Sequence, residues 1–431
     1  MAIHFDALWF QLKKPLSWLI NNLSRMSGRV NILFVVSNEI GFRNQAPIIR
    51  KLACNPNFNI ATYRDSVDKS GISNAALRDL CNNISLTHHQ ARRKKWDYIF
   101  VTDIVSFSPR WNTIFVMQSH GSSIGNQPSN RPDWSLKQAA SSKADIIFLS
   151  NIAQCHHLLR MRPDIVRDPS KLCLLTGSPM ARGAKGESEL SDSVGSHAPP
   201  NILLSSHFTP MSVLRTNGVG IIERVSAEFP DAKVTITAHP RLWSIESPSF
   251  DGTQFRRLVE ETCARLDNVT FFATGSPEDL FASADILLCD YSSILVEFAR
   301  HKKPIVLLLP PNFHFKSAVT ERFYLSSSFP AFSEIDAMRR IREGLADPQR
   351  YSEQQNALIE YFVFDPDNSV ERITQFITEC GKIDKVGAKH WREVRTKLGQ
   401  NEQMLAAIIQ SYIQKNPEIK TIAAKINETD K

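Results

Sequence analysis

The stretch Ala284-Asp-Ile-Leu-Leu-Cys-Asp-Tyr-Ser-Ser-Ile-Leu-Val-Glu-Phe298 joins two segments of different character with no linker between them. Residues 286–289 form a short apolar run of the kind that builds a buried parallel strand. Ser292 and Ser293 then open a segment whose apolar residues recur at helical spacing. A serine pair at a helix start either caps the helix or offers hydroxyls and backbone N–H groups to a phosphate. The stretch therefore predicts a strand followed directly by a helix, with one of these two roles for the serines.

Length and composition are those of a soluble globular protein. The chain has 431 residues, 42% apolar and 22% charged, which is enough for two domains of roughly 150–200 residues each. No apolar run approaches the ~20 residues that a membrane-spanning helix needs. The seven cysteines show no Cys-x-x-Cys spacing, which favours free thiols in a reducing cytoplasm over a disulfide framework or a zinc site.

The net charge of +7 is concentrated at the two ends of the chain. Residues 1–30 carry four basic residues against one acidic residue, and residues 381–431 carry ten against six, whereas the residues between them are neutral. A nucleic-acid enzyme more often spreads basic groups over its body, so we expect no nucleic-acid partner.

The first 29 residues form an amphipathic pattern. Apolar residues from Phe5 to Met26 lie on one helical stripe, and Lys13 and Lys14 lie off it. Such a segment either lies in the plane of an anionic membrane surface or packs on the protein's own body. No small-residue cleavage site follows, so we do not expect a secretory signal.

From residue 30 the chain alternates short apolar strands with helical segments. The strands predicted in the first half cover 30–36, 59–63, 98–101, 113–117, 145–149 and 172–175, and those in the second half cover 201–205, 233–237, 269–272, 286–289 and 304–309. In the first half a polar loop over 37–43 is expected to precede a helix over 45–52, with Pro47 in its first turn. In the second half single helices are expected over 211–228 and 253–266. This alternation predicts an α/β protein with doubly wound, mostly parallel sheets and with ligands at the carboxyl ends of the strands.

The same pattern divides the chain into five expected parts. They are the amphipathic segment 1–29, a first α/β domain over 30–182, a Gly- and Ser-rich linker over 183–200, a second α/β domain over 201–380, and a basic helical segment over 381–431. The last part either crosses back onto the first domain or meets a partner.

Polar motifs follow several of the predicted strands. In chain order they are His120-Gly121, Thr176-Gly-Ser178-Pro, His239-Pro-Arg241, Thr274-Gly-Ser276 and Asp290-Tyr-Ser-Ser293. A histidine such as His120, which opens a loop rich in Gly, Ser, Asn and Pro, can take a proton from an incoming hydroxyl, because its ordinary pKa is near neutrality. His239 and Arg241 can hold a diphosphate, the arginine through charge-assisted hydrogen bonds. Taken singly, each motif also has an ordinary structural reading.

The order of these motifs resembles the CDP-glycerol glycerophosphotransferase family, whose members build teichoic acids and related capsular polymers. The resemblance runs from about His120 to Leu309 and is most specific at Asp290-Tyr-Ser-Ser293, which Lys303-Pro-Ile305 follows. It implies a GT-B fold, with two Rossmann-like domains and a nucleotide donor bound mainly by the second domain.

The resemblance also implies roles for individual residues. His120 resembles the base that activates the acceptor hydroxyl, and His239 would contact the donor phosphates and stabilise the leaving nucleotide. Ser292 and Ser293 would bind the diphosphate, and Glu297 stands where the family usually has an aspartate near the ribose or the helix edge. Further donor-site candidates are Gly121, Ser178, Arg241, Thr274, Ser276 and Asp290. We expect no metal, since the helix dipole and side chains would neutralise the leaving phosphate.

The chain departs from the family pattern around the expected donor pocket. Ser205-Ser-His-Phe208 replaces Pro-Thr-x-Arg, so an arginine expected near the donor is missing. Met180 and Arg182 replace a basic and an acidic residue, and Pro310-Pro-Asn-Phe313 replaces a segment with an acid and a tyrosine. Nucleotide-diphosphate chemistry remains plausible, whereas the identity of the donor is open.

We therefore expect a cytoplasmic transferase, peripheral on the inner face of the cell membrane. It would move a glycerol-phosphate, another polyol-phosphate or a sugar from a nucleotide-activated donor, most simply CDP-linked, to a lipid-linked acceptor of a bacterial surface polymer, with no cofactor besides this donor. One alternative is an enzyme of the same fold that acts on a free nucleotide sugar, such as a 2-epimerase. Another is a non-catalytic nucleotide-binding subunit of a surface-polymer complex.

Overall fold

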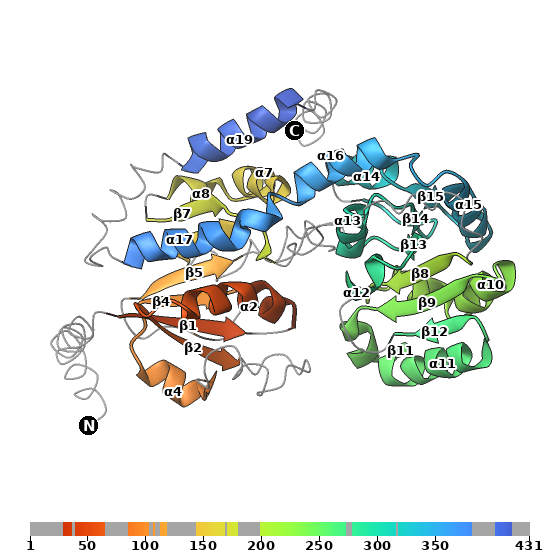
Figure 1. The fold of residues 1–431 in the computed structure, drawn as a ribbon, viewed down its shortest axis with the longest axis horizontal. Helices are drawn as coiled ribbons and strands as arrows, with labels where there is room; N and C mark the ends of the chain where they lie inside the picture. The colour runs from red at the N-terminus through yellow and green to blue at the C-terminus, as the bar shows by residue number, and fades with distance from the viewer. Residues whose placement is uncertain are drawn as a thin grey trace. The chain divides into compact units, whose positions relative to one another are not determined.

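The computed structural model describes residues 29–36, 39–64, 85–102, 107, 113–118, 144–168, 170–179, 199–272, 278–315, 318–381 and 401–415, and the structural statements below concern these residues. They form two α/β units (Figure 1). The described residues up to 179, together with 364–408, belong to the first unit, and residues 199–363 and 409–415 belong to the second.

The first unit is built on a seven-stranded sheet with the strand order β3-β2-β1-β4-β5-β6-β7, in which every pair is parallel. Its strands are β1 (Val30–Val36), β2 (Phe58–Arg64), β3 (Ser85–Leu86), β4 (Tyr98–Val101), β5 (Ile114–Gln118), β6 (Ile146–Leu149) and β7 (Leu172–Leu175). β4, β5 and β6 are buried along their whole length, as expected for parallel strands that helices cover on both faces.

Helix α2 (Glu39–Ala53) begins earlier than the sequence pattern indicates. The polar loop expected over 37–43 and the helix start at residue 45 are wrong, and Pro47 lies inside the helix. An internal proline removes a backbone hydrogen bond at a cost of about 3 kcal/mol. The core of the first unit buries three side chains of α2, those of Ile48, Ile49 and Leu52. Burial of each side chain contributes about 1.5–3 kcal/mol to the stability of the folded state, and together they outweigh the lost hydrogen bond. The other helices of this part are α4 (His88–Arg93), α7 (Ile152–Met161) and α8 (Pro163–Arg167).

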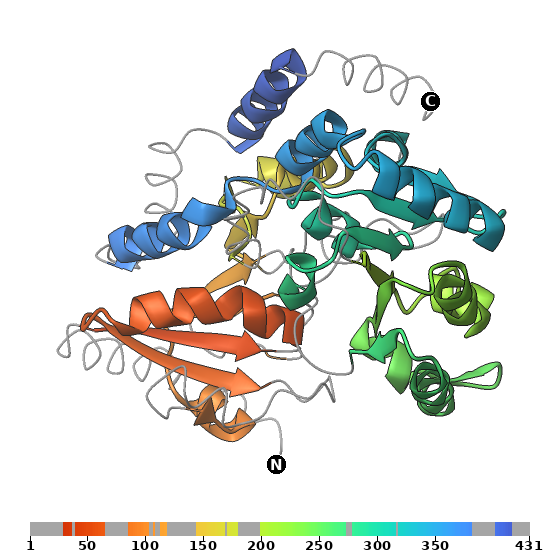
Figure 2. The ribbon, with the colours of Figure 1, turned by 45° about the vertical axis from the view of Figure 1, so that its right-hand side comes forward.

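The chain returns to the first unit after leaving the second. Residues 364–380, which we expected from the sequence to lie in the second domain, belong to the first unit. Helix α17 (Ser369–Gly381) lies beside α2, as both views show (Figures 1 and 2), and its Ile373 and Ile377 are fully buried in the core of the first unit. The 3-10 turn η3 (Pro366–Asn368) precedes α17, and α19 (Asn401–Lys415) is the last described helix.

Gly177 makes room for this return. Its φ of +85° suits glycine, and a Cβ there would lie 2.4 Å from the carbonyl oxygen of Phe364. One turn into α17, Arg372 donates a hydrogen bond of 2.9 Å to the carbonyl of Thr176. The motif around Gly177 therefore holds the returning chain on the end of β7.

The second unit is built on a six-stranded parallel sheet with the order β12-β9-β8-β13-β14-β15. Its strands are β8 (Asn201–Ser206), β9 (Lys233–Ala238), β12 (Val269–Phe271), β13 (Ile286–Cys289), β14 (Ile305–Leu308) and β15 (Phe329–Ala331). Counted along the chain within this unit, the order is that of a Rossmann sheet, and it reverses direction between β8 and β13. β10 (Glu246–Ser247) and β11 (Phe250–Asp251) form a separate two-stranded antiparallel hairpin.

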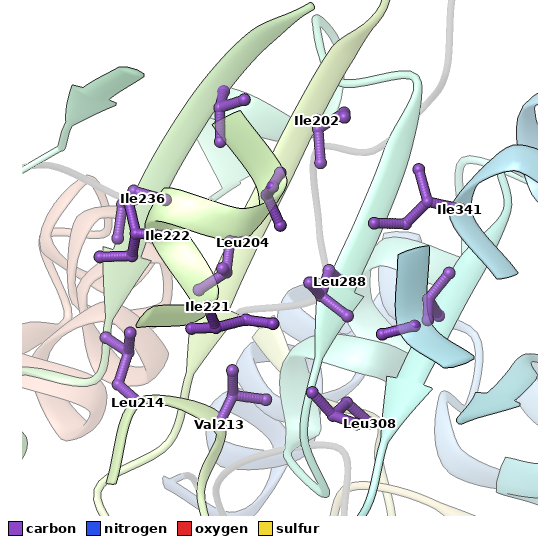
Figure 3. Close-up of a cluster of buried hydrophobic side chains, with 14 of the residues drawn as sticks. Ile202, Leu204, Val213, Leu214, Ile221, Ile222, Ile236, Leu288, Leu308 and Ile341 are labelled. Carbon is purple, nitrogen blue, oxygen red and sulfur yellow. The ribbon is translucent and has the colours of Figure 1, made fainter. Parts of the chain in front are cut away.

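Helices on one face of this sheet enclose its core. Figure 3 shows side chains of the strands, among them Leu204 and Leu288, meeting side chains of the helices, among them Ile222 and Ile341. The helices are α9 (Val213–Asn217), α10 (Gly220–Glu228), α11 (Gly252–Arg265) and α15 (Glu334–Ala346). The single helix expected over 211–228 is wrong, because α9 ends at Gly218, whose φ of +63° terminates it before α10 starts.

The remaining helices of the second unit lie apart from that cluster. They are α12 (Glu278–Phe281), α13 (Ser293–Ala299), α14 (Ala318–Ser326) and α16 (Ser352–Phe362). The 3-10 turn η2 (Pro240–Ser244) instead contributes the buried Leu242 to the cluster. α13 packs on β13 and β14, and α16 packs on α13 and α14. No helix within the described ranges combines the length and apolarity that a bilayer crossing needs.

Candidate functional site

The candidate site lies at the carboxyl ends of β8, β9 and β13, where the strand order of the second unit reverses. β8 pairs with β9 on one side and with β13 on the other. In doubly wound sheets, ligands bind in the crevice outside such a reversal. The residues that directly follow these strands are His207, His239 and Asp290.

Asp290 is fully buried and holds the loop that leads from β8 to α9. Its Oδ2 accepts the backbone N–H groups of His207 and Val213, each at 2.9 Å, and the hydroxyl of Ser206 at 3.3 Å. Burial raises the pKa of Asp290 to about 6, and these hydrogen bonds act in the opposite direction. The structure thus places this sequence-predicted donor ligand inside the protein, where its Oδ2 orders a loop.

His207 and His239 face one another across the β8–β9 pair. Ser206 is the register partner of Ala238, and the N–H of His239 donates to the carbonyl of Ser206 at 2.8 Å, so the pairing continues to the two histidines. Their ring centroids are 5.3 Å apart, with the planes at 68°. Sequence inspection had noted His207 only as part of a departure from the family pattern, and its position directly after a strand was the signal that could have singled it out.

Both imidazoles are neutral at neutral pH. Burial, followed by the neighbouring His239 and Arg241, lowers the pKa of His207 to about 3. Burial, followed by the charge of Arg241, lowers the pKa of His239 to about 4.

The two rings differ in how their nitrogens are used. Nδ1 of His239 accepts the backbone N–H of Arg241 at 3.1 Å, so neutral His239 carries its proton on Nε2. Nδ1 of His207 is shielded from solvent and has no hydrogen-bond partner among the described residues. His239 therefore offers its Nε2–H as a hydrogen-bond donor, whereas Nδ1 of His207 makes no hydrogen bond within the described part of the chain.

Arg241 brings positive charge to the same place. Its guanidinium lies over the ring of Phe208, 4.7 Å from the centroid. That ring in turn lies 4.2 Å from His207 and 4.8 Å from His239, centroid to centroid. Phe208 occupies the position at which the family pattern has arginine, and the guanidinium of Arg241 stacks on it, an arrangement that suits arginine.

The predicted strand-to-helix junction at Ser292 is confirmed. Ser292 is the N-cap of the seven-residue helix α13, and its hydroxyl accepts the N–H of Ile294 at 3.5 Å. Ser293 is the first residue of α13, and Glu297 lies half-buried on the same helix. The ring of Tyr291, between Asp290 and Ser292, packs against Phe313, Phe315 and Tyr324 at centroid distances of 5.1–5.3 Å.

The candidates of the first unit occupy a different sheet. Ser178 is buried, and its hydroxyl donates to Oδ1 of Asn44 at 3.3 Å. Gln118 ends β5, two residues before His120, and its buried side-chain amide has no hydrogen-bond partner within the described ranges. His120, Gly121, Thr274 and Ser276, like residues 1–28, lie outside the described residues.

The two doubly wound sheets define an α/β protein of the GT-B fold. Residues 250–379 match the family model described as CDP-Glycerol:Poly(glycerophosphate) glycerophosphotransferase. Over these residues the match confirms the resemblance inferred from the sequence. The match supports a transferase, and it includes Asp290, Ser292, Ser293 and Glu297.

Solved structures share the fold. A variant of the wall teichoic acid polymerase TagF is 12% identical, with 82% of this chain and 89% of that chain covered and a TM-score of 0.54. The putative UDP-N-acetylglucosamine 2-epimerase from Listeria monocytogenes is 11% identical, with 83% of this chain and 98% of that chain covered and a TM-score of 0.55. The S. aureus MnaA–UDP structure is 14% identical, with 82% of this chain and 98% of that chain covered and a TM-score of 0.53. At these identities the likeness concerns the fold alone. No curated protein matches the sequence significantly.

Proposed function

We propose that the protein transfers a glycerol-phosphate, another polyol-phosphate or a sugar from a CDP-linked donor to a growing bacterial surface polymer. The observation that carries this proposal is the family match over residues 250–379, which includes the residues that follow β13. The Rossmann strand order of the same unit supports it, because that order creates a ligand crevice beside β8 and β13.

His239 and Arg241 are the proposed ligands of the donor's diphosphate. The Nε2–H of neutral His239 donates a hydrogen bond to a phosphate oxygen, and the guanidinium of Arg241 adds a charge-assisted bond. As the bond to the transferred group breaks, negative charge grows on the leaving nucleotide, and both groups stabilise it. Ser292, Ser293 and Glu297 are proposed to complete the donor site on the strength of the family pattern, with Thr274 and Ser276 beside them.

His120 is the proposed base for the acceptor hydroxyl, and the adjacent Gly121 is a proposed donor-site residue. This assignment rests on its place in the family's motif order. The lipid-linked acceptor would be met at the inner membrane surface, where the basic amphipathic segment 1–29 binds anionic lipid, each basic residue contributing about 1 kcal/mol. No metal enters this scheme.

A 2-epimerase acting on a free nucleotide sugar is the second candidate. It is favoured by the fold likeness to a putative UDP-N-acetylglucosamine 2-epimerase and to MnaA in complex with UDP, whose TM-scores of 0.55 and 0.53 are close to the 0.54 of the TagF variant. The two candidates differ in the reaction, because the transferase cleaves a CDP-linked donor and releases nucleotide, whereas the epimerase converts a UDP-sugar.

Turnover of a donor panel tests the proposal. Full-length protein is incubated with CDP-glycerol, CDP-ribitol, UDP-N-acetylglucosamine and a CMP-sugar, with and without lipid-linked acceptor, and nucleotide release is followed by chromatography beside a His120→Ala variant. Acceptor-dependent release of CMP that His120→Ala abolishes, while nucleotide binding persists, supports the transferase. Conversion of the UDP-sugar alone supports the epimerase. Binding without any turnover indicates a non-catalytic subunit.

A further inference from the structure

His207 has the geometry of a ligand-binding residue that the family pattern does not include. It directly follows β8, on the side of the strand reversal where ligands bind, and its ring faces that of His239 at 5.3 Å. Its Nδ1 has no hydrogen-bond partner in the described part of the chain, although the atom is buried. A buried polar atom without a partner is unfavourable by about 1–3 kcal/mol, so the free protein retains a group that a bound ligand can satisfy.

We propose that His207 is a second histidine that contacts the diphosphate of the donor, and that the donor binds together with one proton taken up by His207 from solvent. This inference rests on the proposed function, since it concerns the same nucleotide-diphosphate ligand. It goes beyond that function by assigning a residue and a proton to the binding step.

The groups around His207 explain why the free imidazole stays neutral. His239 faces it from the end of β9, Arg241 lies beyond Phe208 on η2, and Arg215 of α9 donates a hydrogen bond to the carbonyl of Phe208 at 3.4 Å. The buried Asp290 accepts the backbone N–H of His207 with Oδ2. Burial, followed by His239 and Arg241, holds the pKa of His207 at about 3.

A bound diphosphate raises the pKa of His207. Two negative charges beside Arg241 offset the repulsion that an imidazolium would meet, and they attract the proton directly. The proton passes from solvent to the free nitrogen of His207, and it returns to solvent when the nucleotide leaves. No other bond is made or broken.

His239 does not compete for this proton. Its Nδ1 is occupied by the backbone N–H of Arg241, and a second proton on the ring would remove that acceptor. The two histidines therefore have different tasks, with His239 donating as a neutral group and His207 as a cation.

Calorimetry of CDP-glycerol binding tests the inference. The diphosphate of CDP-glycerol is esterified at both ends, so each phosphoryl group keeps one strongly acidic oxygen and the diphosphate does not titrate near neutrality. Full-length protein is titrated in HEPES and in Tris, which differ in ionisation enthalpy, between about pH 7 and pH 8.5, where Asp290 with its pKa of about 6 stays ionised. We expect net proton uptake and an affinity that falls with rising pH by up to about tenfold per pH unit.

The variant His207→Asn is compared with His301→Asn. His301 belongs to the same unit, and burial likewise lowers its pKa, to about 4, but it packs against Phe281 and Phe298, away from the site. We expect His207→Asn to lose the proton uptake and to bind CDP-glycerol about tenfold or more weakly. His301→Asn should retain both properties.

The other possible results distinguish a failure of the proposed role of His207 from a failure of the proposed function. Proton uptake that persists in a folded His207→Asn variant, or unchanged affinity, overturns the role of His207 and leaves the proposed function standing. If His207→Asn fails to fold, His207→Gln replaces it under the same criteria. The wild-type protein provides a test that needs no variant, because nucleotide binding without proton uptake overturns the inference. A wild-type protein that binds none of the nucleotides overturns the proposed function and this inference together.

Discussion

The carboxylate of Asp290 accepts the backbone N–H of His207 at 2.9 Å, so the residue after β13 fixes the residue after β8. The two strands are neighbours at the strand reversal, and this hydrogen bond ties their ends together beside the candidate site. The position of the His207 ring therefore depends on a carboxylate that solvent does not reach.

Asp290 should make stability depend on pH in an unusual direction. Its pKa in the folded protein, about 6, lies above the ordinary 3.8, so the folded state binds the proton more tightly than the unfolded state does. Stability from this group is therefore greatest at low pH and declines as pH rises from about 4 to about 6, by about 3 kcal/mol at most.

The variant Asp290→Asn removes this titration. Denaturant unfolding of the second unit, measured between pH 4 and pH 7, should show the wild-type protein losing stability relative to the variant as the pH rises. Parallel curves for the two proteins would contradict a raised pKa at Asp290.

Gly177→Ala should destabilise the first unit. A Cβ at this position meets the carbonyl of Phe364 at 2.4 Å, and the φ of +85° is unfavourable for alanine. We expect a loss of roughly 2 kcal/mol or more, measured by thermal unfolding.

Gly220→Ala is the matched control for that substitution. Gly220 begins α10 and has open space around a Cβ, so alanine should be neutral or stabilising by up to about 1 kcal/mol. Equal effects of the two substitutions would rule out the tight contact at Gly177.

Arg241→Lys should weaken donor binding although it keeps the charge. The planar guanidinium stacks on Phe208, whereas a lysine ammonium is a strongly hydrated point charge without the same fork of donors. We expect a loss of roughly 1 kcal/mol, or about fivefold in the dissociation constant of CDP-glycerol. Arg256→Lys, another arginine beside a phenylalanine ring but on α11, should leave affinity unchanged. Equal affinities for all three proteins would exclude Arg241 from the site.

Lys303→Met should reduce stability without changing nucleotide affinity. The Nζ of Lys303 donates to the carbonyls of Phe281, Ala282 and Ala284 at 3.2, 2.7 and 2.6 Å, so it satisfies the carboxyl end of α12. Removing these bonds should cost about 1–3 kcal/mol in chemical denaturation. Exposed Lys233 provides the control substitution Lys233→Met. A selective loss of nucleotide binding by Lys303→Met would instead place this residue in the donor site.

The alternation of strands and helices was predictable because most strands of the two large sheets are largely buried, so their sequences are apolar runs. The strands at 30–36, 98–101 and 172–175 have the predicted bounds for this reason. The start of α2 was missed because local signals around Pro47 oppose a helix that the core stabilises. Gly218 was overlooked as a stop because apolar residues continue at helical spacing on both sides of it.

The candidate site was only partly predictable. His239 and Arg241 were identified from a motif at a strand end, and the structure brings them together through the N–H of Arg241. Asp290 was assigned to the ligand, because sequence does not reveal that a carboxylate is turned toward backbone N–H groups 77 and 83 residues earlier. His207 was not assigned a role because its partner across the sheet depends on strand register.

The return of the chain at Phe364 also determines when the first unit can form during synthesis. Its core includes Ile373, Ile377 and Cys380 of α17, which the ribosome makes only after residues 199–363 of the second unit. The amino-terminal sheet therefore emerges from the ribosome with an uncovered apolar face and must wait for a helix made some 190 residues after β7. Until then it depends on chaperones or on its own solubility, whereas the second unit already has its own buried core.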